Sequence, residues 1–198
     1  MLKGIIFDLD GTLVDSRLDF DRMREEIGIL NGQPVLEFVE GLPEGYEKTR
    51  CWEILLRHEY RGANEATVIP GISELLEKLS RLKIQQGILT RNRMGPTKLA
   101  LERLSLNSFS QIITRDEAPP KPDPTGLLMI CDAWNCAPEE VIFVGDYRFD
   151  ILAGKAAGIK TVLYAPDEIP SYAVDADYVV TKDFHRFALE FEEFAKNL

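Results

Sequence analysis

Short apolar runs alternate with amphipathic segments along most of this chain, and the alternation restricts the possible folds more than any other feature. The runs that predict strands are 3–10, 83–90, 110–116, 140–146 and 160–165. The segments that predict helices are 71–82, 95–106, 123–134 and 147–158. Strands and helices in alternation form βαβ units. We therefore predict an α/β protein with a Rossmann-like parallel sheet, helices on both faces, and ligands beyond the carboxyl ends of the strands.

One stretch interrupts the alternation directly after the first strand. From about Asp15 to Thr67 the sequence holds only helical patterns, such as DFDRMREEIGIL, separated by glycines and prolines. An insert of roughly 50 residues is too long for a structureless loop. We expect a small helical cap subdomain over 15–67, above the carboxyl end of the first strand. The α/β core domain would then consist of 1–14 and 68–198.

The last segment carries four phenylalanines at a spacing of three or four residues: Phe184, Phe187, Phe191 and Phe194. This spacing predicts a helix with one apolar stripe. The stripe can pack on the sheet or form the seam between two copies, so we expect a monomer or a homodimer.

The composition argues against several classes of partner and location. The formal net charge of −10 disfavours a nucleic-acid backbone or an anionic membrane as a partner. No apolar run approaches the roughly 18 residues of a membrane span. Asp8 and Asp10 break the apolar stretch that a signal peptide would need. The three cysteines are an odd number without a zinc-like spacing, so we expect free thiols and a cytoplasmic location.

Two carboxylates follow the apolar residues of the first strand in GIIFDLDGTLVDS. Residues i and i+2 of a strand face the same side, so Asp8 and Asp10 begin side by side. Paired carboxylates repel each other unless a cation or a proton lies between them. A hard divalent ion removes this repulsion, and Mg²⁺ suits a site that also holds phosphate oxygens. Taken alone, the pair is also consistent with a helix cap or a turn.

A second acidic group follows the strand predicted at 140–146. In VIFVGDYRFD, Asp146 ends the strand and Asp150 lies one helical turn later. Taken separately, Asp146 is consistent with an N-cap and Asp150 with a solvated helix residue. Beside Asp8 and Asp10, at the carboxyl edge of the same sheet, the two residues fit metal ligation better.

Groups suited to phosphate follow two other segments. The proline-rich APPKPDP is a stiff loop whose single cation, Lys121, is held in a fixed direction and can balance a phosphate dianion. Thr90 ends the strand at 83–90, where its hydroxyl and the following backbone N–H groups can bind phosphate oxygens. Arg91 either adds positive charge at the entrance or faces solvent.

The order of these four elements, DLDGT, a strand-terminal threonine, KPDP and GDYRFD, resembles that of the haloacid dehalogenase-like hydrolase superfamily. The resemblance runs from about Ile5 to Ala165, and the helical insert falls where that family has its small cap. Within the family, DLDGTLVDS is similar to the phosphoglycolate phosphatases. The sequence departs from that subgroup in two places, because the insert is shorter and Arg91 stands where asparagine is usual.

The resemblance implies a Mg²⁺-dependent phosphatase that hydrolyses a small phosphorylated metabolite through an aspartyl-phosphate intermediate. Asp8 would be the nucleophile, and Asp10 the general acid and then the general base. Thr90, Arg91 and Lys121 would bind the phosphate group of the substrate.

The implied Mg²⁺ ligands are the side chains of Asp8 and Asp146 and the backbone carbonyl of Asp10. Asp150 would be a further ligand or would hold the ligands in place. Two other functions stay open: a phosphomutase of the β-phosphoglucomutase type, which would need a cap that excludes water, and a non-catalytic binding module. The second aspartate argues against dehalogenase chemistry, since the dehalogenases of this superfamily lack it.

Overall fold

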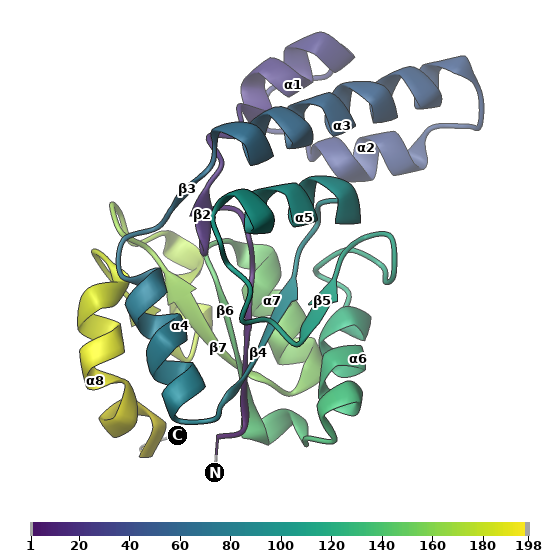
Figure 1. Ribbon diagram of the computed structural model, residues 1–198. Coiled ribbons are helices and arrows are strands. Elements are labelled where there is room, and N and C mark those ends of the chain that lie inside the picture. The colour runs from purple at the N-terminus through teal and green to yellow at the C-terminus, as the bar shows by residue number, and fades with distance from the viewer. Residues whose placement is uncertain (1, 197–198) are drawn as a thin grey trace.

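The computed structural model describes residues 2–196, which form a parallel sheet covered by helices and a separate group of helices above it (Figure 1). The sheet strands are β1 (Gly4–Phe7), β4 (Gln85–Leu89), β5 (Gln111–Ile113), β6 (Val141–Gly145), β7 (Lys160–Tyr164) and β8 (Tyr178–Val180). Their order is β5-β4-β1-β6-β7-β8, and each neighbouring pair is parallel. The predicted α/β class and parallel sheet are confirmed. The short outer strand β8 lies outside the predicted strands.

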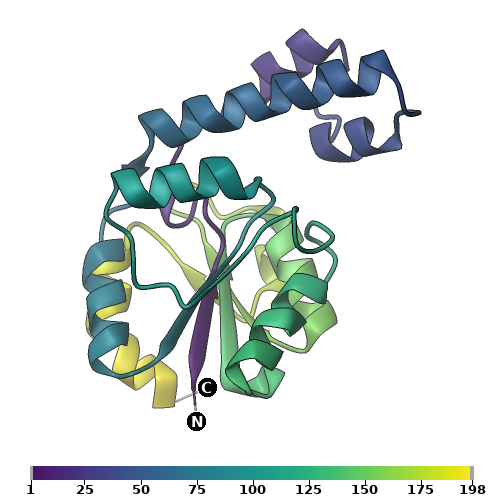
Figure 2. The same ribbon diagram turned by 45° about the vertical axis from the view of Figure 1, so that its right-hand side comes forward.

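Helices cover both faces of the sheet, as predicted. Figure 2 shows α4 (Ile72–Arg81) and α8 (Phe184–Lys196) on one face, and α6 (Thr125–Trp134) and α7 (Arg148–Ala157) on the other. Helix α5 (Met94–Arg103) lies across the carboxyl edge of the sheet. Two short 3-10 helices, η1 (Pro138–Glu140) and η2 (Ser171–Asp175), lie in the connections. Among the described helices, none is long and apolar enough to cross a membrane.

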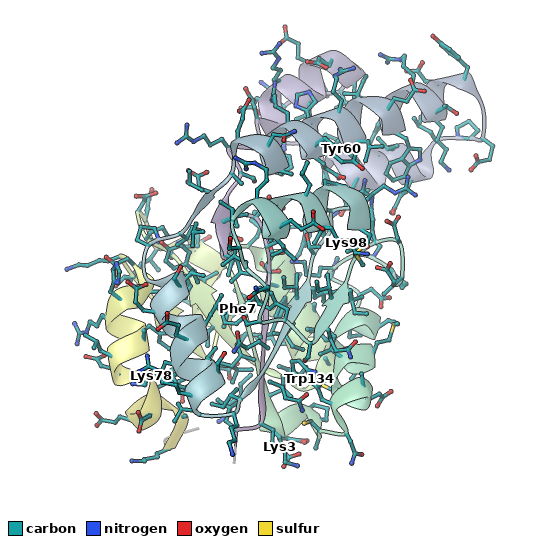
Figure 3. The ribbon with its side chains drawn as sticks, viewed as in Figure 1. Lys3, Phe7, Tyr60, Lys78, Lys98 and Trp134 are labelled. Carbon is teal, nitrogen blue, oxygen red and sulfur yellow. The ribbon has the colours of Figure 1, made fainter. Side chains whose placement is uncertain are left out.

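The central strand β1 is buried on both faces, which explains its unbroken apolar sequence. Ile5 and Phe7 belong to the hydrophobic core on the side of α4 and α8, and Ile6 belongs to the core on the opposite side. Figure 3 shows Phe7 in the interior, between the sheet and the helices that cover it. The phenylalanine stripe of α8 packs into the first core, and Phe191 is fully buried there. The stripe therefore packs within the chain, and the number of copies in solution stays a prediction.

The insert after β1 forms three helices, α1 (Phe20–Ile27), α2 (Val35–Gly41) and α3 (Tyr46–Glu65), which we call the three-helix unit. These helices share a buried apolar cluster of their own. The chain enters the unit through β2 (Val14–Asp15) and leaves it through β3 (Thr67–Val68). The two strands form an antiparallel pair. Sequence patterns gave no sign of this two-residue pairing, because a periodicity cannot be detected over so few residues.

Ion pairs add to the apolar contacts between α1 and α3. Glu26 on α1 interacts with Arg57 and His58 on α3 and with Arg22 one turn earlier. Desolvation acts to raise the pKa of Glu26, but hydrogen bonds from Arg57, His58 and Arg22 outweigh it and lower the pKa to about 2. Arg50 on α3 donates to the backbone oxygen of Ile27 at 3.0 Å, at the carboxyl end of α1.

Helix α3 also joins the three-helix unit to the sheet unit, because it packs along α5. Tyr60 lies on α3 where that helix passes over α5 (Figure 3). A Cβ atom on Gly95 of α5 would lie 2.3 Å from the Tyr60 hydroxyl, so the small residue allows this close contact. Nearby, Arg103 donates to the backbone oxygen of Ala63 at 2.9 Å.

Candidate active site

Three adjacent strands end beside each other at the carboxyl edge of the sheet. Asp8 follows β1, Thr90 follows β4, and Asp146 follows β6. Pairing continues one residue past the end of β1, since the backbone N–H of Asp8 donates to the oxygen of Val144 at 2.8 Å. Because β1 lies between β4 and β6, the topology brings these three polar residues to one place.

A buried lysine lies between two of the predicted carboxylates. The Lys121 ammonium is 2.7 Å from Oδ1 of Asp8 and 2.6 Å from Oδ1 of Asp150, and its side chain is only 2% exposed. Burial alone would lower the pKa of Lys121, but the carboxylates of Asp150 and Asp8 outweigh burial and raise it. The Lys121 ammonium is thus held in its charged form beside Asp8, the predicted nucleophile.

The acidic residues outnumber this lysine. Oxygens of Asp8, Asp146 and Asp150 all lie within 4.8 Å of one another. Burial, followed by the negative charge of Asp150, raises the pKa of Asp146 to about 7. Burial also raises the pKa of Asp8 well above its ordinary value, against the opposing effect of Lys121. Asp150 is buried and Asp8 and Asp146 are partly buried, and carboxylate oxygens in excess of nearby cations are a donor set that fits a hard divalent cation.

A glycine makes room for one of these carboxylates. Gly11 has φ +77°, and a Cβ atom placed on it would lie 2.3 Å from Oδ2 of Asp146. Both the left-handed backbone and the close approach therefore require glycine at this position. The hydroxyl of Thr12, the next residue, donates to Oδ1 of Asp146 at 3.3 Å. Gly11 and Thr12 of the sequence DGT thus fix the position of the Asp146 carboxylate, which follows a strand far away in sequence.

The carboxylate of Asp10 has hydrogen-bond partners outside this acidic group. The Asn92 side chain donates to Oδ2 of Asp10 at 2.6 Å, and Ser16 also forms a hydrogen bond with Asp10. Burial raises the pKa of Asp10, and the hydrogen bonds from Ser16 and Asn92 act against this rise. We did not identify Asn92 from the sequence. The available signal was an amide two residues after the strand-terminal Thr90.

The two remaining predicted phosphate ligands lie in different surroundings. Thr90 is buried, and its hydroxyl accepts a hydrogen bond from the backbone N–H of Asn92 at 3.1 Å. Arg91 instead extends to the three-helix unit, where its guanidinium lies 2.7 Å from Glu37 of α2. The same guanidinium lies 4.6 Å from the centre of the Phe149 ring. Binding of phosphate by Thr90 and Arg91 stays a prediction.

Comparison with known proteins agrees with this arrangement of motifs. Residues 5–164 match the sequence model of the family described as haloacid dehalogenase-like hydrolase. The chain belongs to the haloacid dehalogenase-like hydrolase family. The family predicted from the four motifs is thereby confirmed.

The similarity extends to whole chains. A haloacid dehalogenase-like hydrolase domain-containing protein of Arabidopsis thaliana is 32% identical, over 90% of this chain and 80% of that protein. Phosphoglycolate phosphatase 1 of Pseudomonas aeruginosa is 30% identical, over 79% of this chain and 66% of that protein. The crystal structure of a hydrolase from Pseudomonas syringae superposes with a TM-score of 0.80 at 22% identity, covering 96% of this chain and 98% of that one. This last likeness supports the fold.

A cavity of about 550 Å³ lies between the strand ends and the three-helix unit. Asp8, Asp10, Thr90 and Asp146 all line it, so the cavity reaches the predicted site. Residues of α1, α2 and α3 form the opposite wall. A ligand in this cavity would contact both the strand ends and the three-helix unit.

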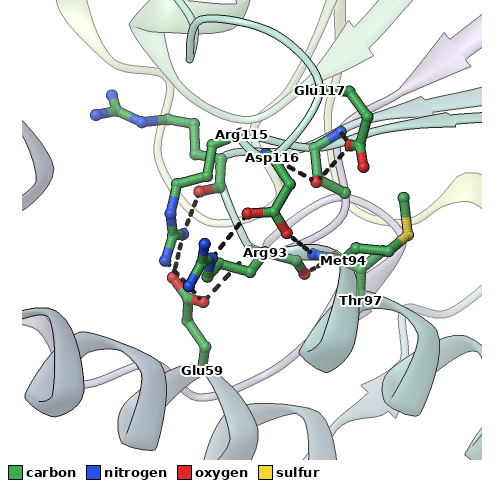
Figure 4. A network of polar contacts seen from close by, with 9 residues as sticks. Glu59, Arg93, Met94, Thr97, Arg115, Asp116 and Glu117 are labelled. Carbon is green, nitrogen blue, oxygen red and sulfur yellow. Dashed lines mark hydrogen bonds and ion pairs between the residues drawn. The ribbon is translucent and has the colours of Figure 1, made fainter.

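A buried ion pair beside the cavity connects the two units (Figure 4). Glu59 of α3 and Arg115, which follows β5, are 4% and 5% exposed, and one of their contacts joins Nη2 to Oε2 at 3.1 Å. Arg115 also donates to the backbone oxygen of Arg91 at 2.6 Å. Nearby, Arg93 pairs with Asp116 at 2.7 Å, on a more exposed part of the same network. Neither Glu59 nor Arg115 was predicted from the sequence to be a site residue.

Proposed function

We propose that this protein is a phosphatase that hydrolyses a small phosphorylated metabolite through an aspartyl-phosphate intermediate on Asp8. The observation that carries the proposal is the position of Asp8, in contact with a buried lysine and beside the carboxylates of Asp146 and Asp150. A nucleophilic carboxylate is repelled by a phosphate dianion, and a fixed cation at this distance reduces the repulsion. Membership of a hydrolase family supports the same reaction class.

The two oxygens of Asp8 have different surroundings. Oδ1 accepts hydrogen bonds from the Leu9 backbone N–H at 2.7 Å and from Lys121. We therefore assign nucleophilic attack to Oδ2. A bond forms between Oδ2 and phosphorus while the bond from phosphorus to the ester oxygen breaks. Lys121, held by Asp150 as well, keeps its charge beside the phosphoryl group in both steps.

Asp10 is the proposed proton donor and acceptor. Its pKa is raised chiefly by burial, which favours the protonated carboxyl that can give a proton to the leaving oxygen. The resulting carboxylate then takes a proton from the water that attacks phosphorus, and inorganic phosphate leaves while Asp8 is regenerated. The hydrogen bonds from Asn92 and Ser16 orient this side chain between the two steps.

We propose Mg²⁺ as the metal. Asp8 and Asp146 would hold it by their side chains and Asp10 by its backbone carbonyl. Asp150 would support these ligands, because its two oxygens already accept from Lys121 and from the backbone N–H of Tyr147. When bound, the metal would supply positive charge for the phosphate oxygens.

The three-helix unit is proposed to be the cap, with 15–67 as the cap subdomain and 1–14 and 68–198 as the core. Within residues 2–196, the backbone passes between the three-helix unit and the sheet only at the paired strands β2 and β3. Two adjacent connections of this kind suit a hinge. Exclusion of water is the usual benefit of such a cover in phosphoryl transfer. A cytoplasmic location is proposed with it.

The test is release of inorganic phosphate from a panel of phosphomonoesters, with Mg²⁺ or with EDTA. We expect metal-dependent turnover that falls by about a thousandfold or more in Asp8→Asn, on the scale seen when a nucleophile is removed. Asp132→Asn, an exposed aspartate of α6, is the matched control and should keep full activity. Undiminished turnover in Asp8→Asn would contradict the mechanism. Transfer of the phosphoryl group back to a sugar phosphate would instead indicate the phosphomutase.

A further inference from the structure

The wall of the cavity opposite Asp8 is largely apolar. Met23 of α1, Val35 and Leu36 of α2 and Leu55 of α3 line it with the small part of each side chain that is not buried. Phe20 of α1, which is 49% exposed, lines it with a larger apolar surface. Phe149 lines it from the first turn of α7. A leaving group that extends from the phosphate toward α2 therefore meets hydrocarbon, which favours apolar parts of a ligand over charged ones.

Three of the arginines that line this cavity already have carboxylate partners. Arg24 lies 2.7 Å from Asp21, Arg91 lies 2.7 Å from Glu37, and Arg115 is paired with Glu59. An anionic group on the ligand would have to displace one of these carboxylates. For Arg115 that exchange leaves the carboxylate of Glu59, which is only 4% exposed, without its cation, and this acts strongly against binding of the anion. Glu37 and Asp21 are 43% and 77% exposed, so solvent reduces the same effect at Arg91 and Arg24.

Two other arginines line the cavity at its exposed mouth. Arg17 is two-thirds exposed and lies 3.7 Å from Asp15. Arg148 is exposed, and its guanidinium lies 5.2 Å from the centre of the Phe149 ring. Solvent screens charges in such positions, so they add little selectivity for an anion held deeper in the cavity.

The size of the cavity points in the same direction. A volume of about 550 Å³ is within the range of sites that enclose a drug-sized ligand. A two-carbon leaving group such as glycolate would fill a small part of it and would leave the apolar wall uncovered.

We propose that the cavity selects phosphate esters whose leaving group is bulky, mainly apolar and uncharged, such as an alcohol that carries a fused ring. This inference rests on the proposed phosphatase function and names the substrate class for it. Selectivity comes from the apolar residues of α1, α2 and α3, and from carboxylates that neutralise the inner arginines. Phosphoglycolate, whose leaving group carries a carboxylate, is expected to be a poor substrate.

Three primary-alcohol phosphates test the proposal, because their leaving oxygens are similar. These are the esters of 2-(2-naphthyl)ethanol, ethylene glycol and glycolic acid. We expect kcat/KM for the naphthyl ester to exceed that for either small ester by about tenfold or more. The Asp8→Asn protein with Mg²⁺ should bind the three esters in the same order by calorimetry. Preference for the glycolate ester, equal binding of all three, or no binding of any would overturn the proposal.

The binding measurement keeps this proposal separate from the proposed function. No turnover of any ester, together with tightest binding of the naphthyl ester to Asp8→Asn, would contradict the phosphatase and support the binding class. Turnover of the glycolate ester in preference to the others would support the phosphatase and contradict the binding class.

Glu37→Gln tests the neutralised arginine directly. The substitution releases the charge of Arg91, so kcat/KM for the glycolate ester should rise about tenfold relative to the ethylene glycol ester. Glu40→Gln, on the exposed side of the same helix, is the matched control and should leave this ratio unchanged. The same ratio in wild type and Glu37→Gln would show that paired arginines do not set the selectivity.

Discussion

Loss of Arg115 is expected to be among the most destabilising single changes in this chain. Arg115→Met keeps much of the aliphatic length of the side chain but removes the guanidinium that faces Glu59. The carboxylate of Glu59 is 4% exposed, and its other nearby donor is the backbone N–H of Arg93 at 3.4 Å. Breaking a buried pair by removal of one partner costs about 3–5 kcal/mol, because an unpaired charge stays in the interior. We expect a loss of that size in the free energy of unfolding at neutral pH.

A double variant separates the unpaired charge from the lost packing. In Glu59→Leu with Arg115→Met, no charge is left unpaired, and the free energy of unfolding should return to within about 1–2 kcal/mol of wild type. Arg93→Met is the matched control, since its partner Asp116 is more exposed. That variant should lose no more than about 1 kcal/mol.

Urea denaturation followed by circular dichroism, at several pH values, measures these differences. Burial raises the pKa of Glu59 in the folded wild type, against the opposing effect of Arg115. Without Arg115 the folded pKa rises further, so the folded state takes up protons before the unfolded state as the pH falls. The difference in the free energy of unfolding between wild type and Arg115→Met should therefore become smaller at acid pH. A single variant within 1 kcal/mol of wild type, or a double variant less stable than the single one, would refute the reasoning.

Three further predictions concern other parts of the molecule. Gly11→Ala should destabilise the chain more than Gly32→Ala does in urea denaturation, because both backbones are left-handed but only Gly11 is packed against Asp146; equal losses would contradict the packing argument. Glu26→Gln should lower the free energy of unfolding at pH 7. The carboxylate stabilises the folded state fully above about pH 4.5, and this stabilisation is lost as the pH falls toward about 2, so the difference between variant and wild type should disappear over that range. A difference that persists at the acid end would contradict the assignment. Phe191→Ala should cost about 3–5 kcal/mol in the same assay, because the ring is fully buried in the core beneath α8; a loss below 1 kcal/mol would show that α8 is only loosely docked.

The sequence predicted the residues whose position depends on the sheet alone. Asp8, Thr90 and Asp146 each follow an apolar run, and parallel pairing brings the ends of adjacent strands to one edge. The βαβ pattern predicted parallel strands whose polar ends share one edge, whereas the strand order that makes β4, β1 and β6 neighbours is known from the structure. Lys121 was identifiable because prolines surround the single cation of its loop.

Two of the contacts that the sequence did not predict, those of Glu59 and of Arg91, join the three-helix unit to the residues around the sheet. Glu59 lies in a helical segment rich in charged residues, and periodicity does not tell which of them faces a partner on the sheet unit. Arg91 is adjacent to Thr90 in sequence, yet its side chain reaches Glu37 of α2. Such pairs are set by how α3 and α2 pack over the sheet, and no local pattern encodes that packing.

The place of β1 at the centre of the sheet has a consequence for how the chain folds as it is synthesised. Gly4 pairs with Gln85 on one side and with Val141 on the other, so both neighbours of the first strand are made much later. Pairing over such distances in sequence is slow, and an apolar strand without neighbours is prone to aggregate. The three-helix unit has its own apolar cluster and local contacts, so it can form while β1 waits for β6. The three-helix unit is therefore synthesised, and able to fold, before β6 completes the group of strand ends that holds Asp8 and Asp146.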